Sequence, residues 1–113
     1  MDERKNEIVP CLPLKGITVF PYAVSQIEVG RAFSLRAVEK AIQEELPVFL
    51  VTQTEEEIEQ PQTEDVFACG TLAHILHSEM HEPNLLRITV EGICRARTIE
   101  IMQDEDMLLA SCC

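Results

Sequence analysis

Residues 85–101 read LLRITVEGICRARTIEI, and this stretch decides the fold class. Its first half alternates, with Leu86, Ile88 and Val90 on one parity and charged or polar residues between them. A period of two predicts a strand with one buried face. Towards the end of the stretch, the isoleucines fall on the opposite parity, so we expect a bulge or sharp bend within residues 92–98. Bent strands of this kind close small barrels.

The segment before it, residues 71–81, ends in the run HILHSEMH, for which two structures compete. In a helix, His74, His77 and His81 would gather within about 60° of one another, which suits a metal ion. In a strand, His77 and His81 would lie about 13 Å apart, with His74 on the opposite face. Gly70 and the turn-forming HEPN sequence favour a hairpin. The local pattern therefore favours a strand without a metal site, although amphipathicity alone favours the helix, which stays open at this point.

The other elements follow from periodicity and from breaks in it. The run IVPCLPL should be extended at a barrel edge or rim, because its two prolines cannot donate to a ladder. Next we expect a second half-buried strand and then a helix with Leu35, Val38, Ile42 and Leu46 on one side. A strand covered on both faces should follow the helix. Pro47 should end the helix. The expected ranges are 8–14, 24–30, 31–46 and 48–53.

Composition predicts one soluble domain. The 113 residues are 46% hydrophobic and 26% charged, and the net charge of −11 disfavours nucleic acid and anionic membranes as partners. The chain carries no run of about 20 apolar residues. Five cysteines without C-x-x-C spacing indicate reduced thiols in a cytoplasmic protein, with no catalytic role.

We expect a single domain over residues 1–113, with a flexible N-terminus at 1–7 and a mobile acidic loop at 54–65. The loop holds six acidic residues and hardly any apolar side chain. The final run, MLLASCC, is apolar and stops without a polar terminus, as though a longer protein continued beyond it. We therefore expect this chain to be one domain of a larger parent.

Several motifs resemble the N-terminal domain of the ATP-dependent Lon protease family. They are Leu12-Pro13-Leu14, Phe20-Pro21, Val29-Gly30-Arg31, Gly70-Thr71, Val90-Glu91-Gly92 and Arg95-Ala96-Arg97. The resemblance runs from about residue 8 to residue 101. It implies a PUA-like pseudo-barrel, mainly β, of about six strands with an α-helix packed on it.

The resemblance also implies a role in substrate recognition and assembly for a protease that degrades misfolded and regulatory proteins. Partners would be unfolded or degron-bearing proteins and other subunits of a homo-oligomer, a hexamer in the parent. ATP, Mg and the Ser-Lys endopeptidase site would belong to later domains. This chain has no Walker-A loop and no assignable Ser-Lys pair, so we expect no enzyme activity and no cofactor here. The alternatives are a stand-alone Lon-domain adaptor or a small His-based metalloprotein.

Binding of unfolded protein requires exposed apolar surface. With so few aromatic residues, we expect Phe20 and Phe33 to serve the core and Tyr22 to be exposed. Arginines are favoured at interfaces, although here they could equally neutralise the chain's own carboxylates. After the Gly-Arg pair the chain has Ala32-Phe33, where family members often carry charge. The candidate protein-contact residues are Phe20, Tyr22, Arg31, Phe33, Arg36, Arg95 and Arg97.

Overall fold

A computed structural model describes residues 7–112 of the chain. The expected flexible segment 1–7 falls mostly outside these residues, and Glu7 begins the first strand. Among the residues described, no helix is long and apolar enough to cross a membrane. The elements are β1 (Glu7–Leu14), β2 (Val24–Val29), α1 (Ala32–Glu44), β3 (Val48–Thr52), the 3-10 turn η1 (Thr63–Asp65), β4 (Cys69–Glu82), β5 (Leu85–Asp104) and β6 (Met107–Cys112).

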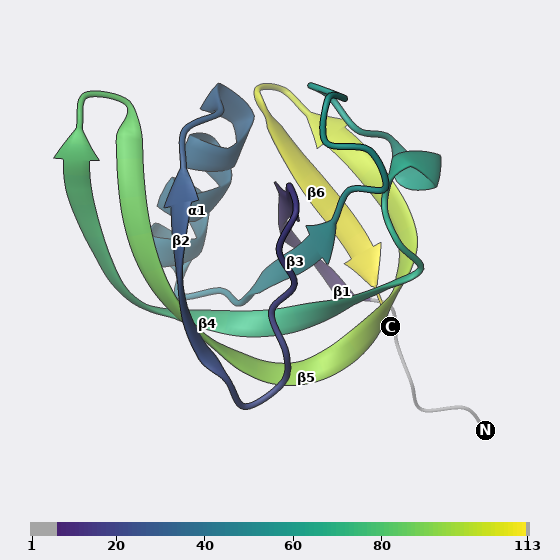
Figure 1. The fold of residues 1–113 in the computed structure, drawn as a ribbon, viewed down its shortest axis with the longest axis horizontal. Coiled ribbons are helices and arrows are strands. Elements are labelled where there is room, and N and C mark those ends of the chain that lie inside the picture. The colour runs from purple at the N-terminus through teal and green to yellow at the C-terminus, as the bar shows by residue number, and fades with distance from the viewer. Residues whose placement is uncertain (1–6, 113) are drawn as a thin grey trace.

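The strands form a curled sheet in the order β2-β5-β4-β3-β1-β6, and β6 pairs again with β5. This second pairing closes a ring, while β2 stays outside it on the edge of β5. The helix α1 packs beside the strands (Figure 1). The β1–β3 pair is parallel and the other strand pairs are antiparallel. The predicted mainly-β pseudo-barrel with one packed helix is confirmed.

The bend predicted in residues 92–98 is also confirmed. Against β4, Gly92 pairs with Ala73 and Cys94 with Leu72, so Ile93 has no direct partner. A second irregularity leaves Ile99 without a direct partner on β6. Each extra residue turns the following side chains to the other face. This is why β5 can serve both sides of the barrel.

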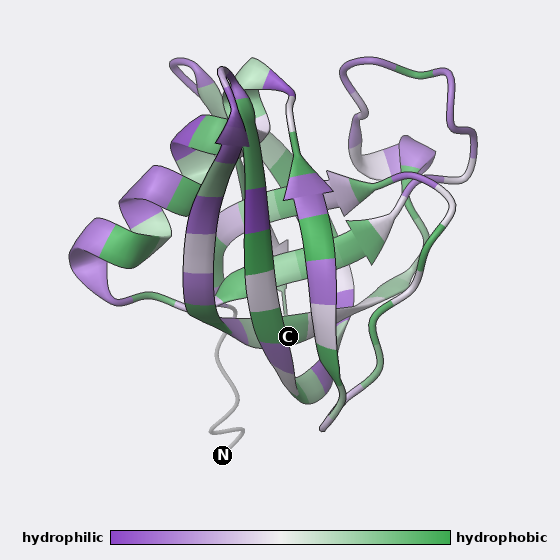
Figure 2. Ribbon diagram, turned by 60° about the vertical axis from the view of Figure 1, so that its left-hand side comes forward, coloured by the Kyte–Doolittle hydropathy of each residue, from purple (hydrophilic) through white to green (hydrophobic). Residues whose placement is uncertain are grey.

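Two hydrophobic clusters fill the core, one on each face of β3. Val48 and Leu50 belong to a cluster with α1 and β2, whereas Phe49 and Val51 belong to a cluster with β6. A strand covered on both faces was predicted here, and the burial of all four residues confirms it. The strands at the front of Figure 2 instead alternate between hydrophilic and hydrophobic residues along their length.

The helix is in the predicted place, and three of the four residues predicted on its buried side, Leu35, Val38 and Leu46, pack in or against the core. Val38 is buried as expected, whereas Ile42 is 46% exposed. Ala37 and Ala41 are buried instead, because small side chains let a helix approach a curved sheet closely. The last turn closes at Glu45, which takes the left-handed conformation before Pro47.

The run expected at a barrel edge or rim forms β1, which is not the outermost strand of the sheet. Residues 7–10 pair with β6 and residues 11–14 pair with β3, so β1 lies between two neighbours. Each half has a neighbour on one side only, which leaves room for prolines that lack an N–H. Pro10 and Pro13 are buried there, one in each half.

The acidic loop at 54–65 lies at the surface and is organised around Gln53, which is only 3% exposed. The Gln53 Nε2 donates to the carbonyls of Glu55 at 3.1 Å and Ile58 at 2.8 Å. At the other end of the loop, the Gln62 N–H donates to Asp65 Oδ2 at 2.9 Å and caps η1. These bonds give a polar segment defined attachments despite its lack of apolar side chains.

Candidate functional site

An exposed aromatic turn connects β1 to β2. The Ala23 N–H donates to the Phe20 carbonyl at 3.2 Å, with Pro21 at the second position and Tyr22 at a φ of 68°. This is the pattern of a type II turn, whose third position normally takes glycine. A tyrosine there is strained by roughly 1 kcal/mol or more, and such strain is often found at functional positions.

Gly92 of β5 holds this turn in place. The Tyr22 N–H donates to the Gly92 carbonyl, and the Gly92 N–H donates to the Ala23 carbonyl, both at 2.9 Å. A Cβ added at Gly92 would lie 2.4 Å from the Phe20 carbonyl oxygen and 3.0 Å from the Pro21 Cα. Two of the motifs singled out in the sequence, Phe20-Pro21 and Val90-Glu91-Gly92, therefore meet here, and glycine is required for their approach.

The connection before the turn is anchored to two further strands. The Thr52 hydroxyl of β3 donates to the Ile17 carbonyl at 2.6 Å, and the Thr71 hydroxyl of β4 donates to the Val19 carbonyl at 2.7 Å. Val19 itself is buried in the core. The backbone of residues 17–23 thus crosses β3, β4 and β5 with an attachment to each.

With its backbone held in this way, the segment and the first residue of β2 direct four apolar side chains to solvent, while Val19 points into the core. Phe20 is 57% exposed, Tyr22 83% and Val24 59%, and Ile17 is exposed as well. We call these four side chains the apolar turn surface. The prediction that Tyr22 is exposed is confirmed, and the prediction that Phe20 serves the core is wrong.

A cleft of about 460 Å³ lies beside this surface, between the end of β1 and the outer edge of β2. The apolar side chains of Leu12, Leu14, Ile27 and Val29 contribute to its walls, and Ile17 belongs to both the cleft and the apolar turn surface. Clefts of this size accommodate small ligands or a few side chains of a peptide.

Arg31 closes one end of the cleft and is committed to internal bonds. Its Nη2 donates to the Pro13 carbonyl and its Nη1 to Gln53 Oε1, both at 2.6 Å. Burial lowers the pKa of the Arg31 guanidinium, and Glu59 partly opposes that shift. Phe33 is half-buried with its ring 5.0 Å from this guanidinium. These two predicted contact residues come together, and their bonds support the fold.

The remaining predicted arginines lie apart from the aromatic turn. Arg36 forms surface ion pairs with Glu39 at 3.3 Å and Asp106 at 3.0 Å. Arg95 and Arg97 are exposed on one face of β5, two residues apart. The structure does not bring the seven candidates into one patch.

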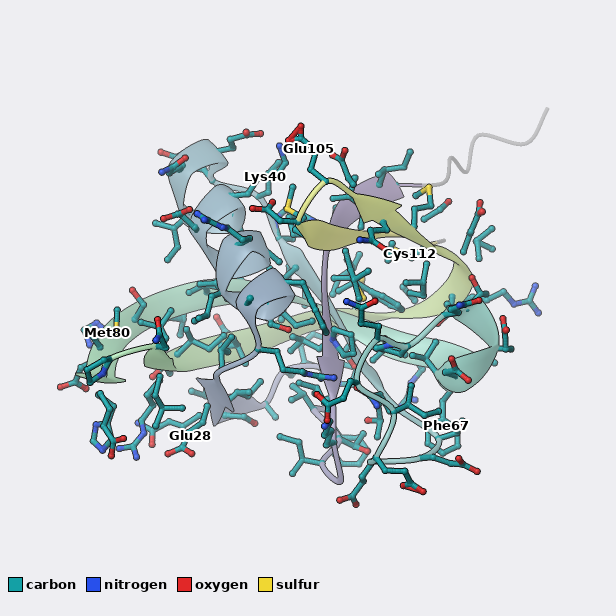
Figure 3. The ribbon with its side chains drawn as sticks, turned by 90° about the horizontal axis from the view of Figure 1, so that it is seen from above. Glu28, Lys40, Phe67, Met80, Glu105 and Cys112 are labelled. Atoms are coloured by element: carbon teal, nitrogen blue, oxygen red, sulfur yellow. The ribbon has the colours of Figure 1, made fainter. Side chains whose placement is uncertain are left out.

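The candidate set missed further exposed apolar side chains: Ile8, Ile17, Val24, Ile42, Phe67, Leu76, Met80 and Ile99. Val24 has the same parity as Gln26 and Glu28, which mark the solvent-facing side of the strand, so its exposure could have been predicted from the alternation. Leu76 and Met80 lie towards the end of the β4–β5 hairpin, where Met80 projects in Figure 3. The exposure of Leu76 and Met80 could be known only from the packing of the residues around them in the folded structure.

The histidine run forms part of β4, so the predicted strand is confirmed. Its faces differ from the prediction, because an irregularity at Leu76 shifts the register. His74 pairs with Glu91 and His77 with Thr89, which puts both histidines on the same face of the sheet. Within residues 7–112 no three His, Cys, Asp or Glu side chains are grouped as a metal ion would require.

The fold and the apolar turn surface define a small β-barrel binding domain. A model of the "ATP-dependent protease La (LON) substrate-binding domain" matches residues 8–112. The chain is 36% identical over 106 residues to Lon protease from Bacillus thuringiensis, and 38% identical over 113 residues to Lon protease from Brevibacillus choshinensis. These matches cover 94% and 98% of this chain, but only 13% and 14% of the relatives.

Two solved structures share the fold, each with a TM-score of 0.71 over 93% of this chain. They are a Lon N-terminal domain protein from Xanthomonas campestris, 16% identical with 57% of its chain covered, and the N-terminal domain of Mycobacterium avium complex Lon protease, 19% identical with 52% covered. The chain described here belongs to the LON substrate-binding domain family.

Proposed function

We propose that this domain captures exposed apolar segments of unfolded or degron-bearing proteins for a Lon-type protease. The observation that carries the proposal is the apolar turn surface, where Phe20, Tyr22 and Val24 are each more than half exposed. Apolar area of this kind, on a backbone tied to three strands, suits contact with another polypeptide. A strained Tyr22 at the tip supports the same use.

The larger protease is also part of the proposal. Because relatives named Lon protease are about seven times longer than this chain, we assign degradation, ATP and Mg use and Ser-Lys peptide cleavage to other domains of the parent. We propose a cytoplasmic homo-oligomer, in the parent a hexamer, to which this domain contributes assembly contacts. Several copies in one assembly would let individually weak contacts retain a substrate. This domain itself would cleave nothing.

Titration with a permanently unfolded protein tests the capture step. Reduced, carboxymethylated α-lactalbumin should shift the NMR resonances of residues 17–24 at millimolar concentration, and Phe20→Ser should weaken this binding about tenfold. Met80→Ser is the matched control, because Met80 is 65% exposed and pairs with Leu86. Leu86 and Gly92 are roughly 20 Å apart along β5, so Met80 lies far from the turn. An absence of any resonance shift, or equal losses in both variants, would contradict the proposal.

A further inference from the structure

We propose that the open edge of β2 accepts an extended segment, rich in apolar and basic residues, as an added β-strand. This inference rests on the proposed function and specifies how a captured segment lies. Within residues 7–112, β2 is the outermost strand of the sheet and pairs only with β5. An unpaired strand edge offers a row of N–H and C=O groups to a second polypeptide.

The hydrogen-bond phase identifies which groups are offered. The Gly92 N–H donates to the Ala23 carbonyl at 2.9 Å, so residues 23 and 92 form a hydrogen-bonded pair. Such pairs alternate with non-hydrogen-bonded pairs along an antiparallel ladder. Val24, Gln26 and Glu28, opposite Glu91, Thr89 and Arg87, are therefore the non-hydrogen-bonded positions. Their backbone groups point away from β5, towards the open side.

The cleft lies on this open side. Gln26 and Glu28 line it together with Leu12 and Leu14 of β1, across a volume of about 460 Å³. Side chains of a strand alternate between its two faces, so a segment paired with β2 would direct every second side chain towards these apolar walls. β1 offers few backbone hydrogen bonds to the segment, because Pro13 has no N–H and its carbonyl already accepts a hydrogen bond from Arg31.

The charges around the cleft favour a basic occupant. Glu91 is exposed on the β2–β5 pair, Glu28 is exposed but already pairs with Arg87, and the Glu56 carboxylate lies against Gly16 at the β1 end. The cations nearby are all engaged: Lys15 pairs with Glu59 at 3.4 Å, Arg87 pairs with Glu28 at 3.0 Å, and Arg31 is held by its internal bonds. The chain as a whole carries a charge of −11, which adds long-range attraction for basic segments. Figure 3 shows Glu28 projecting from β2 at the side of the molecule away from Phe67.

Peptides with matched backbones test the mode of binding on the intact chain. The probe is a capped peptide of about eight residues that alternates valine and lysine, long enough to span β2. It should bind and protect the N–H groups of Gln26 and Glu28 from hydrogen exchange. N-methylation of alternate residues on the pairing edge should weaken binding at least tenfold, and replacing lysine by glutamate should also weaken it.

A variant pair tests the same edge from the protein side. Gln26→Pro removes an outward N–H without removing a bond to β5, whereas Gln26→Ala keeps it. Only the proline variant should lose affinity for the peptide. The comparison of the N-methylated and unmethylated peptides uses the unmodified protein, so it would stand even if the proline variant misfolded. Equal binding of the two peptides, or protection outside β2, overturns the inference. If carboxymethylated α-lactalbumin then still binds at residues 17–24, the proposed function stands; if neither polypeptide binds, both fail.

Discussion

The contact between Gly92 and the aromatic turn makes the sharpest prediction. In Gly92→Ala, the new Cβ would lie 2.4 Å from the Phe20 carbonyl oxygen and 3.0 Å from the Pro21 Cα, and both are backbone atoms. The turn must move outwards, which weakens the two hydrogen bonds at 2.9 Å that join it to Gly92. Each bond contributes about 1 kcal/mol, and overpacking adds about 1–3 kcal/mol. We expect a loss of about 3 kcal/mol in the free energy of unfolding.

Urea denaturation measures this loss, and Gly30→Ala is the control. A Cβ at Gly30 would meet only Leu85 Cδ1 at 3.6 Å and the Asn84 carbonyl oxygen at 3.8 Å, which are ordinary contacts. That variant should stay within about 0.5 kcal/mol of the wild type, or gain slightly from a less flexible unfolded chain. For a domain of this size, the Gly92 variant should also melt about 12 °C lower. A Gly92→Ala protein as stable as Gly30→Ala would refute the packing argument.

Three other perturbations probe separate features. Tyr22→Gly should raise the free energy of unfolding by about 1 kcal/mol, since it relieves a φ of 68°, while weakening capture of carboxymethylated α-lactalbumin; a less stable variant in urea would argue against strain. Arg31→Met should cost about 2–3 kcal/mol through the lost bonds to Pro13 and Gln53, whereas Arg36→Met, which loses only surface ion pairs, should cost less than about 1 kcal/mol in the same assay. Burial raises the pKa of the Cys11 thiol above its ordinary value of 9.0, so the unfolded chain loses this proton first as the pH rises. Stability should therefore fall by up to about 1.4 kcal/mol per pH unit above pH 9, and the slope measured in urea at pH 9 to 10 should be shallower in Cys11→Ala.

Local periodicity was sufficient for most of the fold. The alternation in β2 and the first half of β5, the 3.6-residue pattern of α1 and the apolar run of β3 each depend on neighbours within a few positions. The bend in β5 was also readable, because a change of parity within one strand requires an extra residue. These features are properties of single segments.

What the sequence did not reveal depends on contacts between distant segments. The backbone of Phe20 packs against Gly92, seventy-two positions later, a contact that no local pattern records. The shared face of His74 and His77 follows from an irregularity at Leu76, which arises from the fit between two strands and leaves no mark on the pattern of either. The choice of Ala37 and Ala41 over Ile42 as buried positions depends on how closely the sheet curves beneath α1.

The pairing of β1 with β6 has a consequence for how the domain folds. The hairpin of β4 and β5 is local and can form early, but Glu7 finds its partner only at Cys112. Contacts that join such distant parts of a chain slow folding, because the entropy of loop closure is lost before the contacts form. Until β6 has been synthesised, residues 7–10 of β1 and residues 98–104 of β5 lack their strand partner, and such edges are prone to aggregation. The first strand, β1, therefore cannot complete its pairing until β6, the last strand of the barrel, has been synthesised.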